Sequence, residues 1–393
     1  MYASKAFVPA TGLSLALLTA AVCQAAPCPP MVDSLVIAGS TAIQPLVREL
    51  AKVTLANTST KLYYAGLGSC LGVQSVVAGS SLTDVTLSSW NAAGEETKCD
   101  LGAEGVSVDI GVSDVFPASC ISLPGGLPSN IGDFLGPVQT MVFAVPRSSE
   151  EAAISAEAAY YVYGFGEGSG VEPWTDETLI LQRDEESGTQ TMVGLAIGVP
   201  ADRFRGTHTA GSGDLLEQLA SVSADKADSA IGILSASHAE QNRSTLRTLA
   251  FQDFGATCAV LPNRTELSHE KENVRNGLYP IWGPVHMLAA VDERRRPAHP
   301  LAAQLIGFIT GSLELPATLD LLALQAEENV VPQCAMRVTR THEMGPVAPY
   351  LPAQLCGCAY EEAANGTTDC TPCQSTPQCG SGQTCSFGYC EAL

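Results

Sequence analysis

Residues 179–193, LILQRDEESGTQTMV, contain a change from strand pattern to helix pattern that indicates how this chain is built. The apolar run 179–181 is typical of the end of a buried strand, and apolar residues then recur at helical spacing from position 192 onward. Between them, Ser187-Gly188-Thr189 would open a helix with free backbone N–H groups and two hydroxyls. Arg183 adds a rigid fork of charged donors. The stretch indicates either an anion seat at a helix N-terminus or a plain helix cap beside a surface arginine.

Length and charge limit the classes of protein that this chain can represent. With 393 residues, two compact lobes and an appendage are expected. Lys and Arg number 20 against 41 Asp and Glu, a net charge of −21, so neither nucleic acid nor anionic lipid is an expected partner. Because such a chain repels anions at long range, an anion site must be built locally from backbone dipoles and one or two charges.

Residues 1–26 are typical of an export signal, which predicts a periplasmic or cell-surface protein. Lys5 precedes a short apolar stretch, 13–22, that is too short to span a bilayer, and alanines at 25 and 26 offer a cleavage site. Lipidation at Cys23 is the alternative to simple cleavage. The 14 cysteines fit an oxidising compartment. If Cys23 is removed, an odd number remains, which implies a free thiol, an external partner or a different cleavage site.

Strands and helices alternate along the rest of the chain, which favours an α/β architecture with ligands at the carboxyl ends of parallel strands. The long apolar segment 279–290 could pass between two lobes. Short loops with small hydroxyl residues follow several of the expected strands, and a carboxylate follows another. These strands are expected near residues 35–38, 61–65, 106–112, 137–145, 179–181 and 230–234.

Four of these stretches together resemble one family, the periplasmic phosphate-binding proteins of PstS-type phosphate ABC importers. They are residues 37–45 (IAGSTAIQP), 64–73 (YAGLGSCLGV), 109–116 (DIGVSDVF) and 183–189 (RDEESGT). The resemblance implies a type II periplasmic-binding-protein fold of two α/β lobes joined by two crossings. The predicted domain limits are a signal peptide at 1–26, a binding domain at 27–348 and a Cys-rich tail at 349–393. Lobe 1 would comprise about 33–140 and 284–348, and lobe 2 about 141–283.

The resemblance also implies which residues hold the anion. In the first lobe these are Thr41, the amide of Ala42, Ser69 and Asp114. In the second lobe they are Arg183, Ser187, Gly188 and Thr189. Glu185 matches a family aspartate that orients the arginine, although a glutamate is longer.

Asp114 has a competitor, because about thirty extra residues separate it from Ser69 relative to the family spacing. Ser89 stands at the usual distance, but the stretch 109–116 matches over its whole length, so Asp114 is the predicted ligand. A buried carboxylate can accept a hydrogen bond from phosphate, which keeps a proton near neutral pH, but faces only lone pairs on sulfate. Such unpaired polar groups can reject an analogue by roughly 10⁴-fold or more, so Asp114 predicts selectivity for phosphate, and Ser89 in that place would predict less.

No catalytic role is predicted. The six histidines lie in no recognisable triad context and no G-x-S-x-G stretch occurs, so an enzyme is not expected. The tail at 349–393 holds closely spaced cysteines that could bind zinc or form disulfides, and export favours disulfides, so neither a metal nor a cofactor is predicted.

The sequence therefore predicts an exported, monomeric protein that captures inorganic phosphate for an ABC importer permease. Two alternatives stay open at this point. The ligand could be another tetrahedral oxyanion, namely sulfate, molybdate or arsenate. The protein could also be a non-transport sensing or adhesion protein of the cell surface that uses the same fold.

Overall fold

The computed structural model of this protein describes residues 1, 26–31, 33–56, 60–317 and 319–393. The predicted signal segment lies outside the described residues apart from Met1 and Ala26, and so does Cys23. In the part of the chain that is described, no helix has both the length and the apolar character needed to cross a membrane.

The first lobe is built on a sheet in which β2, β3 and β6 are parallel neighbours. Because they run in the same direction, their carboxyl ends meet at one edge. The strands of this lobe follow the order β1-β5-β4-β3-β2-β6-β14-β7. Their bounds are β1 (Ala26–Pro27), β2 (Leu35–Gly39), β3 (Leu62–Ala65), β4 (Thr86–Trp90), β5 (Glu96–Asp100), β6 (Ile110–Ser113), β7 (Ile131–Pro146) and β14 (Trp282–Ala290).

β2 shows why this sheet is covered on both faces. All five of its residues are buried, with Leu35 and Ile37 in one apolar cluster and Val36 and Ala38 in another. The alternation follows from the two-residue period of a strand. Helices α1 (Gln44–Leu55) and α9 (Pro300–Ile309) pack together in the first of these clusters, whereas α2 (Ser69–Val77) packs on β2 and β6.

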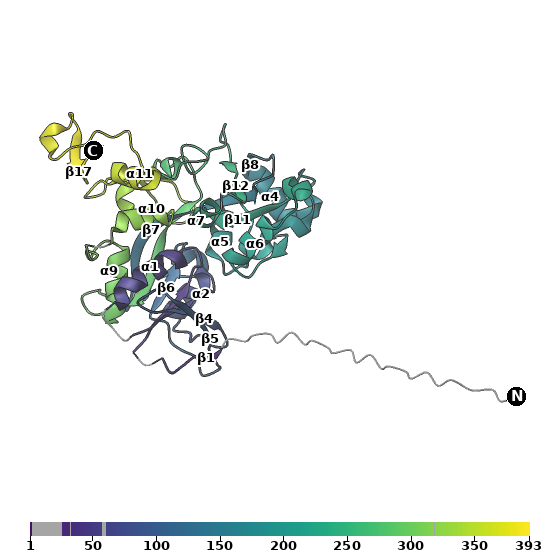
Figure 1. Ribbon diagram of the computed structural model, residues 1–393, viewed down its shortest axis with the longest axis horizontal. Helices are drawn as coiled ribbons and strands as arrows, with labels where there is room; N and C mark the ends of the chain where they lie inside the picture. The colour runs from purple at the N-terminus through teal and green to yellow at the C-terminus, as the bar shows by residue number, and fades with distance from the viewer. Residues whose placement is uncertain (2–25, 32, 57–59, 318) are drawn as a thin grey trace.

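The second lobe continues the sheet through β7 in the order β7-β11-β9-β10, with β12 also paired to β7. Its helices surround these strands in the teal part of Figure 1. The strands are β8 (Ala153–Ser155), β9 (Ile180–Gln182), β10 (Thr207–His208), β11 (Ile231–Ser235), β12 (Leu246–Thr248) and β13 (Ala250–Gln252). The helices are α4 (Ala156–Phe165), α5 (Gly188–Ile197), α6 (Ser212–Ala220), α7 (Ala236–Gln241) and α8 (Glu272–Arg275).

Two strands pass between the lobes, as the sequence predicted. β7 pairs with β14 up to Thr140 and with β11 and β12 from Met141 onward. The chain into β14 starts among the apolar residues of the second lobe at Ile281 and ends among those of the first at Ala289. Both crossings lie next to each other, so movement of the lobes would concentrate there.

The C-terminal segment packs on the second lobe. Ala335 and Met336, which lie within the limits predicted for the first lobe, and Cys356 and Tyr360 of the tail are buried in the apolar cluster of the second lobe. The remaining elements are α3 (Pro117–Cys120), α10 (Leu321–Glu327), β15 (Val338–Thr339), β16 (Ala348–Pro349), α11 (Gly357–Asn365), β17 (Gln383–Ser386) and β18 (Tyr389–Ala392).

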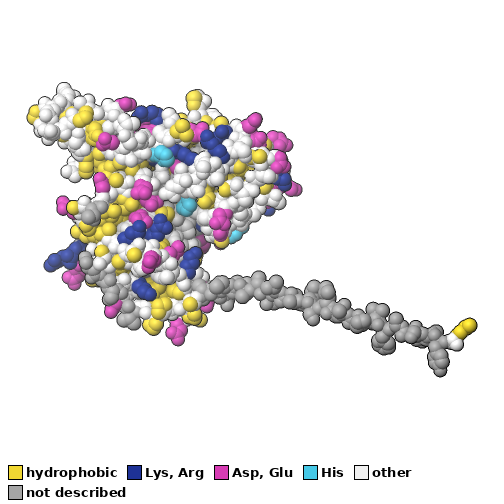
Figure 2. Space-filling model, in the orientation of Figure 1, with side chains coloured by type: hydrophobic (Ala, Val, Ile, Leu, Met, Phe, Trp, Pro, Cys, Tyr) yellow, Lys and Arg dark blue, Asp and Glu magenta, His cyan; other side chains and the backbone are white. Residues whose placement is uncertain are grey.

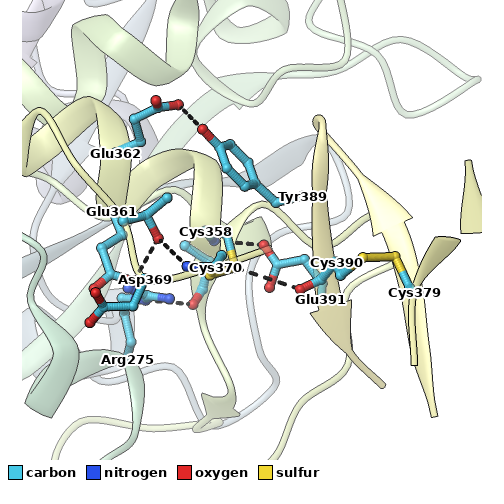
Figure 3. Close-up of a disulfide and its surroundings, with 12 residues drawn as sticks. Arg275, Cys358, Glu361, Glu362, Asp369, Cys370, Cys379, Tyr389, Cys390 and Glu391 are labelled. Carbon is cyan, nitrogen blue, oxygen red and sulfur yellow. Dashed lines mark hydrogen bonds between the residues drawn. A yellow bond between two sulfur atoms is a disulfide. The ribbon is translucent and has the colours of Figure 1, made fainter. Parts of the chain in front are cut away.

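The end of the tail folds back onto α11 through a polar contact. The Glu391 carboxylate accepts a hydrogen bond from the Cys358 amide at 2.6 Å (Figure 3). Burial lowers the pKa of the nearby Arg275, and the charge of Glu391 is one of several that partly oppose this shift. Arg275 also donates to the Ala335 carbonyl at 3.1 Å and stacks over the ring of Tyr360 at 5.8 Å. The tail is therefore attached to the second lobe by buried polar contacts as well as by the chain.

The predicted disulfides are present, in the tail and elsewhere. Cys258 is an exposed free thiol, so one unpaired cysteine is accounted for within the described residues. The pairs are Cys28–Cys99, Cys70–Cys120, Cys334–Cys356, Cys358–Cys370, Cys373–Cys385 and Cys379–Cys390.

A buried ion pair lies in the second lobe. Lys271, which is 0% exposed, donates to the Glu240 carboxylate at 2.7 Å, and Arg243 and His269 approach the same carboxylate at 3.2 Å. Burial by itself raises the pKa of Glu240, but the charge of Lys271 and the other contacts hold it at about 2. The stability linked to this carboxylate is present above its ordinary pKa of 4.5 and is lost as the pH falls toward 2.

Replacing Lys271 by methionine should lower the free energy of unfolding by about 3 kcal/mol at pH 7, because Glu240 then keeps a buried charge without its main partner. Urea unfolding followed by circular dichroism would measure the change. The control is Arg296→Met, which breaks the exposed Arg296–Asp292 pair and should cost less than about 1 kcal/mol. Equal losses for the two variants would contradict a dominant role of burial.

Candidate anion-binding site

Three loops of the first lobe place polar side chains at one edge of the sheet. Ser40 and Thr41 follow β2, Ser69 begins α2 just after β3, and Asp114 follows β6. Since these three strands are parallel neighbours, the loops lie side by side. Ser40, Ser69 and Asp114 are all buried.

Asp114 is the centre of this loop set. Its Oδ2 accepts hydrogen bonds from the hydroxyl of Ser40 and, at 3.3 Å, from that of Ser69, while its own amide donates to Ser69 Oγ at 3.1 Å. Its Oδ1 is buried and has no hydrogen-bond partner among the described residues. Ser89, the competing residue, hydrogen bonds with Thr97 Oγ1 at 2.7 Å within the β4–β5 pair.

Burial raises the pKa of Asp114 to about 6. The hydrogen bonds from Ser40 and Ser69 and the positive charges of Arg183 and His286 oppose this rise. The carboxyl group is therefore mostly ionised at pH 7 and mostly protonated below about 6. A group with this behaviour can change its hydrogen-bonding role within one pH unit of neutrality.

The second lobe contributes Arg183 and the start of α5. Arg183 follows β9 and is 3% exposed; its Nη1 donates to Ser212 Oγ at 2.9 Å, and its buried Nε has no partner among the described residues. Ser187 is the N-cap of α5, with its Oγ accepting from the Gln190 amide at 3.4 Å. The helix thus begins at Gly188, and the Arg183 amide is tied to its first turn by a hydrogen bond to Gln190 Oε1 at 2.8 Å.

The two lobes touch around these residues. A Cβ atom at Gly188 would lie 2.2 Å from Ser69 Oγ and 3.3 Å from the Cβ of Asp114, so only glycine allows this approach. The Cys70 amide donates to the Glu186 carbonyl at 3.0 Å, and the hydroxyls of Thr41 and Ser212 lie 2.9 Å apart. The structure therefore has its lobes closed.

The structure brings together the residues that the sequence assigned to both lobes. Thr41, Ser69 and Asp114 face Arg183 and the start of α5 across the lobe contact. The amide of Ala42 hydrogen bonds to Ser40 Oγ at 3.0 Å. The residues brought to this region are Thr41, Ala42, Ser69, Asp114, Arg183, Ser187, Gly188 and Thr189.

The expected role of Glu185 is not supported. Its side chain is exposed, and the acids whose charges raise the pKa of Arg183 against the lowering by burial are Asp184, Asp114 and Asp214. The adjacent residue, Asp184, has the largest of these charge effects on Arg183. The sequence could not distinguish the two acids, because the loop after β9 has no strand or helix period from which side-chain direction can be predicted.

Two residues of this region were missed. Ser40 lies in the Gly39-Ser40-Thr41 turn, but the family resemblance implied Thr41 and Ala42 as the ligands from this loop. Ser212 begins α6 after β10, which has only two residues. A strand this short leaves no alternating pattern in the sequence from which the following loop could be predicted. Ser212 is 2% exposed and contacts both Thr41 and Arg183.

The surface does not draw anions to this region. Acidic side chains are spread over both lobes on the face shown in Figure 2 and are interspersed with basic ones. With a net charge of −21, the protein as a whole repels anions, so binding must depend on the local donors just described.

Comparison with known proteins settles the fold. No family model and no curated protein matches the sequence. A Clostridium perfringens structure, described as a phosphate ABC transporter substrate-binding protein with bound phosphate, has a TM-score of 0.51 and 16% identity, covering 76% of this chain and 99% of its own. The chain therefore has the two-lobed fold of the type II periplasmic binding proteins. The PstS-type fold and the α/β class predicted from the sequence are confirmed.

Two further solved structures are similar at lower scores. One is a possible phosphate-binding protein from Planctomyces limnophilus, with 15% identity, a TM-score of 0.45 and coverage of 77% of this chain and 93% of its own. The other is an ABC-type phosphate transport receptor from Vibrio cholerae, with 13% identity, a TM-score of 0.46 and coverage of 76% and 99%.

Proposed function

We propose that this protein binds inorganic phosphate between its lobes. The observation that carries the proposal is the pairing of two buried groups with spare hydrogen-bonding capacity, Asp114 Oδ1 and Arg183 Nε, on the two sides of the lobe contact. Each lies close enough to shift the pKa of the other. A ligand that both accepts from a guanidinium and donates to a carboxylate satisfies both.

Phosphate has that combination near neutral pH, because it carries negative charge and at least one proton. Arg183, the hydroxyls and the N-terminal amides of α5 would donate to its oxygens. The Asp114 carboxylate would accept a hydrogen bond from the protonated oxygen of phosphate. Sulfate offers the same acceptors but no proton, so the Asp114 carboxylate would face a lone pair and repel it. Arsenate is the analogue that such a site would distinguish least.

Transport is the role that best joins the remaining features. The signal-like residues 1–26, the six disulfides and the type II fold support an exported protein that delivers phosphate to an ABC importer permease as a monomer. No catalytic role is proposed. A surface sensor using the same site would bind phosphate equally well and differ only in its partner.

The test is isothermal titration calorimetry on the mature protein after bound anion has been stripped by partial unfolding and refolding. Phosphate and sulfate are titrated separately at pH 7.5 or above, where Asp114 is ionised. We expect binding of phosphate and no detectable heat with sulfate. Binding of neither anion would reject the proposal, and equal binding of both would reject the role given to Asp114.

Replacing Ser212 by alanine should weaken phosphate binding by roughly tenfold, because one hydrogen bond to a charged group and the link to Thr41 are lost. Calorimetry at pH 7.5 would measure the change. The matched control is Ser221→Ala, an exposed serine at the other end of α6, which should leave the affinity within about twofold. An unchanged affinity in Ser212→Ala would remove Ser212 from the site.

A further inference from the structure

The Cys70–Cys120 disulfide lies next to two of the three first-lobe loops of the site, those of Ser69 and Asp114. Cys70 follows Ser69 in the first turn of α2, and Cys120 ends α3, the short helix after the Asp114 turn. Their Cα atoms are 4.9 Å apart. We propose that this disulfide positions Ser69 against Asp114 and thereby sets the affinity of the anion site, an inference that rests on the proposed function.

Hydrogen bonds next to both cysteines connect the Cys70–Cys120 disulfide to the residues of the site. Ser69 and Asp114 exchange two hydrogen bonds, at 3.1 and 3.3 Å, one residue before Cys70 and six before Cys120. The Cys70 amide in turn donates to the Glu186 carbonyl of the second lobe at 3.0 Å. The disulfide therefore links the Ser69 and Asp114 loops at the place where they contact the second lobe.

The surroundings explain why a covalent bond matters here. Cys70 and Cys120 both line a cavity of about 800 Å³ between the lobes, together with Gln74 and Glu186. Cys120 is only partly buried where it packs against the apolar cluster of Val73, Ile131 and Leu288, so packing alone does not enclose the loops on this side. A covalent link preorganises them instead, so less order has to be gained when an anion binds.

The other disulfides lie elsewhere, which supplies a matched control. Cys28–Cys99 belongs to the same lobe but joins the residue after β1 to β5, at the sheet edge beyond β4 and β3. It closes a longer stretch of chain than Cys70–Cys120, 71 residues against 50, so its loss should cost at least as much stability.

The experiment compares the double variants Cys70→Ser/Cys120→Ser and Cys28→Ser/Cys99→Ser by calorimetry with phosphate and by thermal unfolding. Both variants should unfold at lower temperature. Only the first should lose affinity, by roughly tenfold or more. If the serine pair does not fold, Cys70→Val/Cys120→Ala keeps the apolar volume and allows the same comparison. Unchanged affinity in the first variant, or equal loss in both, would overturn the proposal.

Hydrogen exchange separates this inference from the proposed function. If the wild-type protein fails to bind phosphate, the function falls but the positioning role is still measurable. The Asp114 amide, which donates to Ser69, should then exchange faster in Cys70→Ser/Cys120→Ser than in Cys28→Ser/Cys99→Ser. Equal exchange rates in the two variants would overturn the inference independently of any ligand.

Discussion

Replacing Asp114 by asparagine should allow sulfate to bind and lower the ratio of phosphate affinity to sulfate affinity by roughly 10³-fold. The asparagine amide keeps the shape of the carboxyl group but carries no charge and can donate a hydrogen bond. Sulfate then meets a donor instead of a lone pair, while phosphate loses the acceptor for its proton. Calorimetric titration of both anions at pH 7.5 measures the two affinities.

The pH dependence of sulfate binding gives the same prediction a second measurement. The pKa of Asp114 is raised to about 6 by burial, so above that pH sulfate binding requires uptake of a proton by the carboxylate. The apparent sulfate affinity of the wild-type protein should therefore rise about tenfold for each pH unit lowered toward 6 and level off below it. In Asp114→Asn the sulfate affinity should not depend on pH in this range.

The stability of the anion-free protein supplies an independent check. Because the folded pKa of Asp114 lies above its ordinary value of 3.8, its contribution to stability is complete below 3.8 and is lost as the pH rises through about 6. Asp114→Asn should thus be more stable than the wild-type protein at pH 7, by on the order of 1–3 kcal/mol.

Ser89→Ala is the control for the competing position, and its ratio of phosphate to sulfate affinity should equal that of the wild-type protein. A shift of selectivity in Ser89→Ala instead would show that the wrong residue was chosen.

The sequence could predict the loops of the site because they follow strands with clear apolar patterns. β2, β3 and β6 are parallel neighbours and each is followed by a short polar turn, so these turns lie at the same edge of the first-lobe sheet. A similar turn follows β9 in the second lobe. Asp114 could be placed for the same reason, since β6 precedes it directly. Most of the predicted fold therefore follows from local patterns that agree with one another.

The residues that escaped prediction lie where no such period exists. Ser212 follows a strand of two residues, and Asp184 and Glu185 lie in an irregular loop in which side-chain direction is set by tertiary contacts. Tyr360 of the tail is buried in the core of the second lobe, a placement that its Cys-rich surroundings could not indicate. Long-range packing, and not local propensity, decides these positions.

Replacing Arg183 by alanine should weaken phosphate binding by about 4 kcal/mol, or roughly 10³-fold. Arg183 is a charged donor that the second lobe brings to the lobe contact; its Nη1 donates to Ser212, and its buried Nε has no partner among the described residues. Without it, a doubly charged anion would be desolvated beside Asp114 with only neutral donors. Calorimetry at pH 7.5 measures the loss, with the displacement of a weakly bound anion used if the heat becomes too small.

Two further variants make the outcome specific to the guanidinium. Arg203→Ala removes an exposed arginine of the same lobe and should leave the affinity within about twofold, which excludes an effect of net charge alone. Arg183→Lys keeps the charge but loses the planar fork, so it should fall between the wild-type protein and Arg183→Ala. If Arg183→Ala bound phosphate as tightly as Arg203→Ala, the anion would have to bind away from the lobe contact, since no site built around Asp114 alone could hold it.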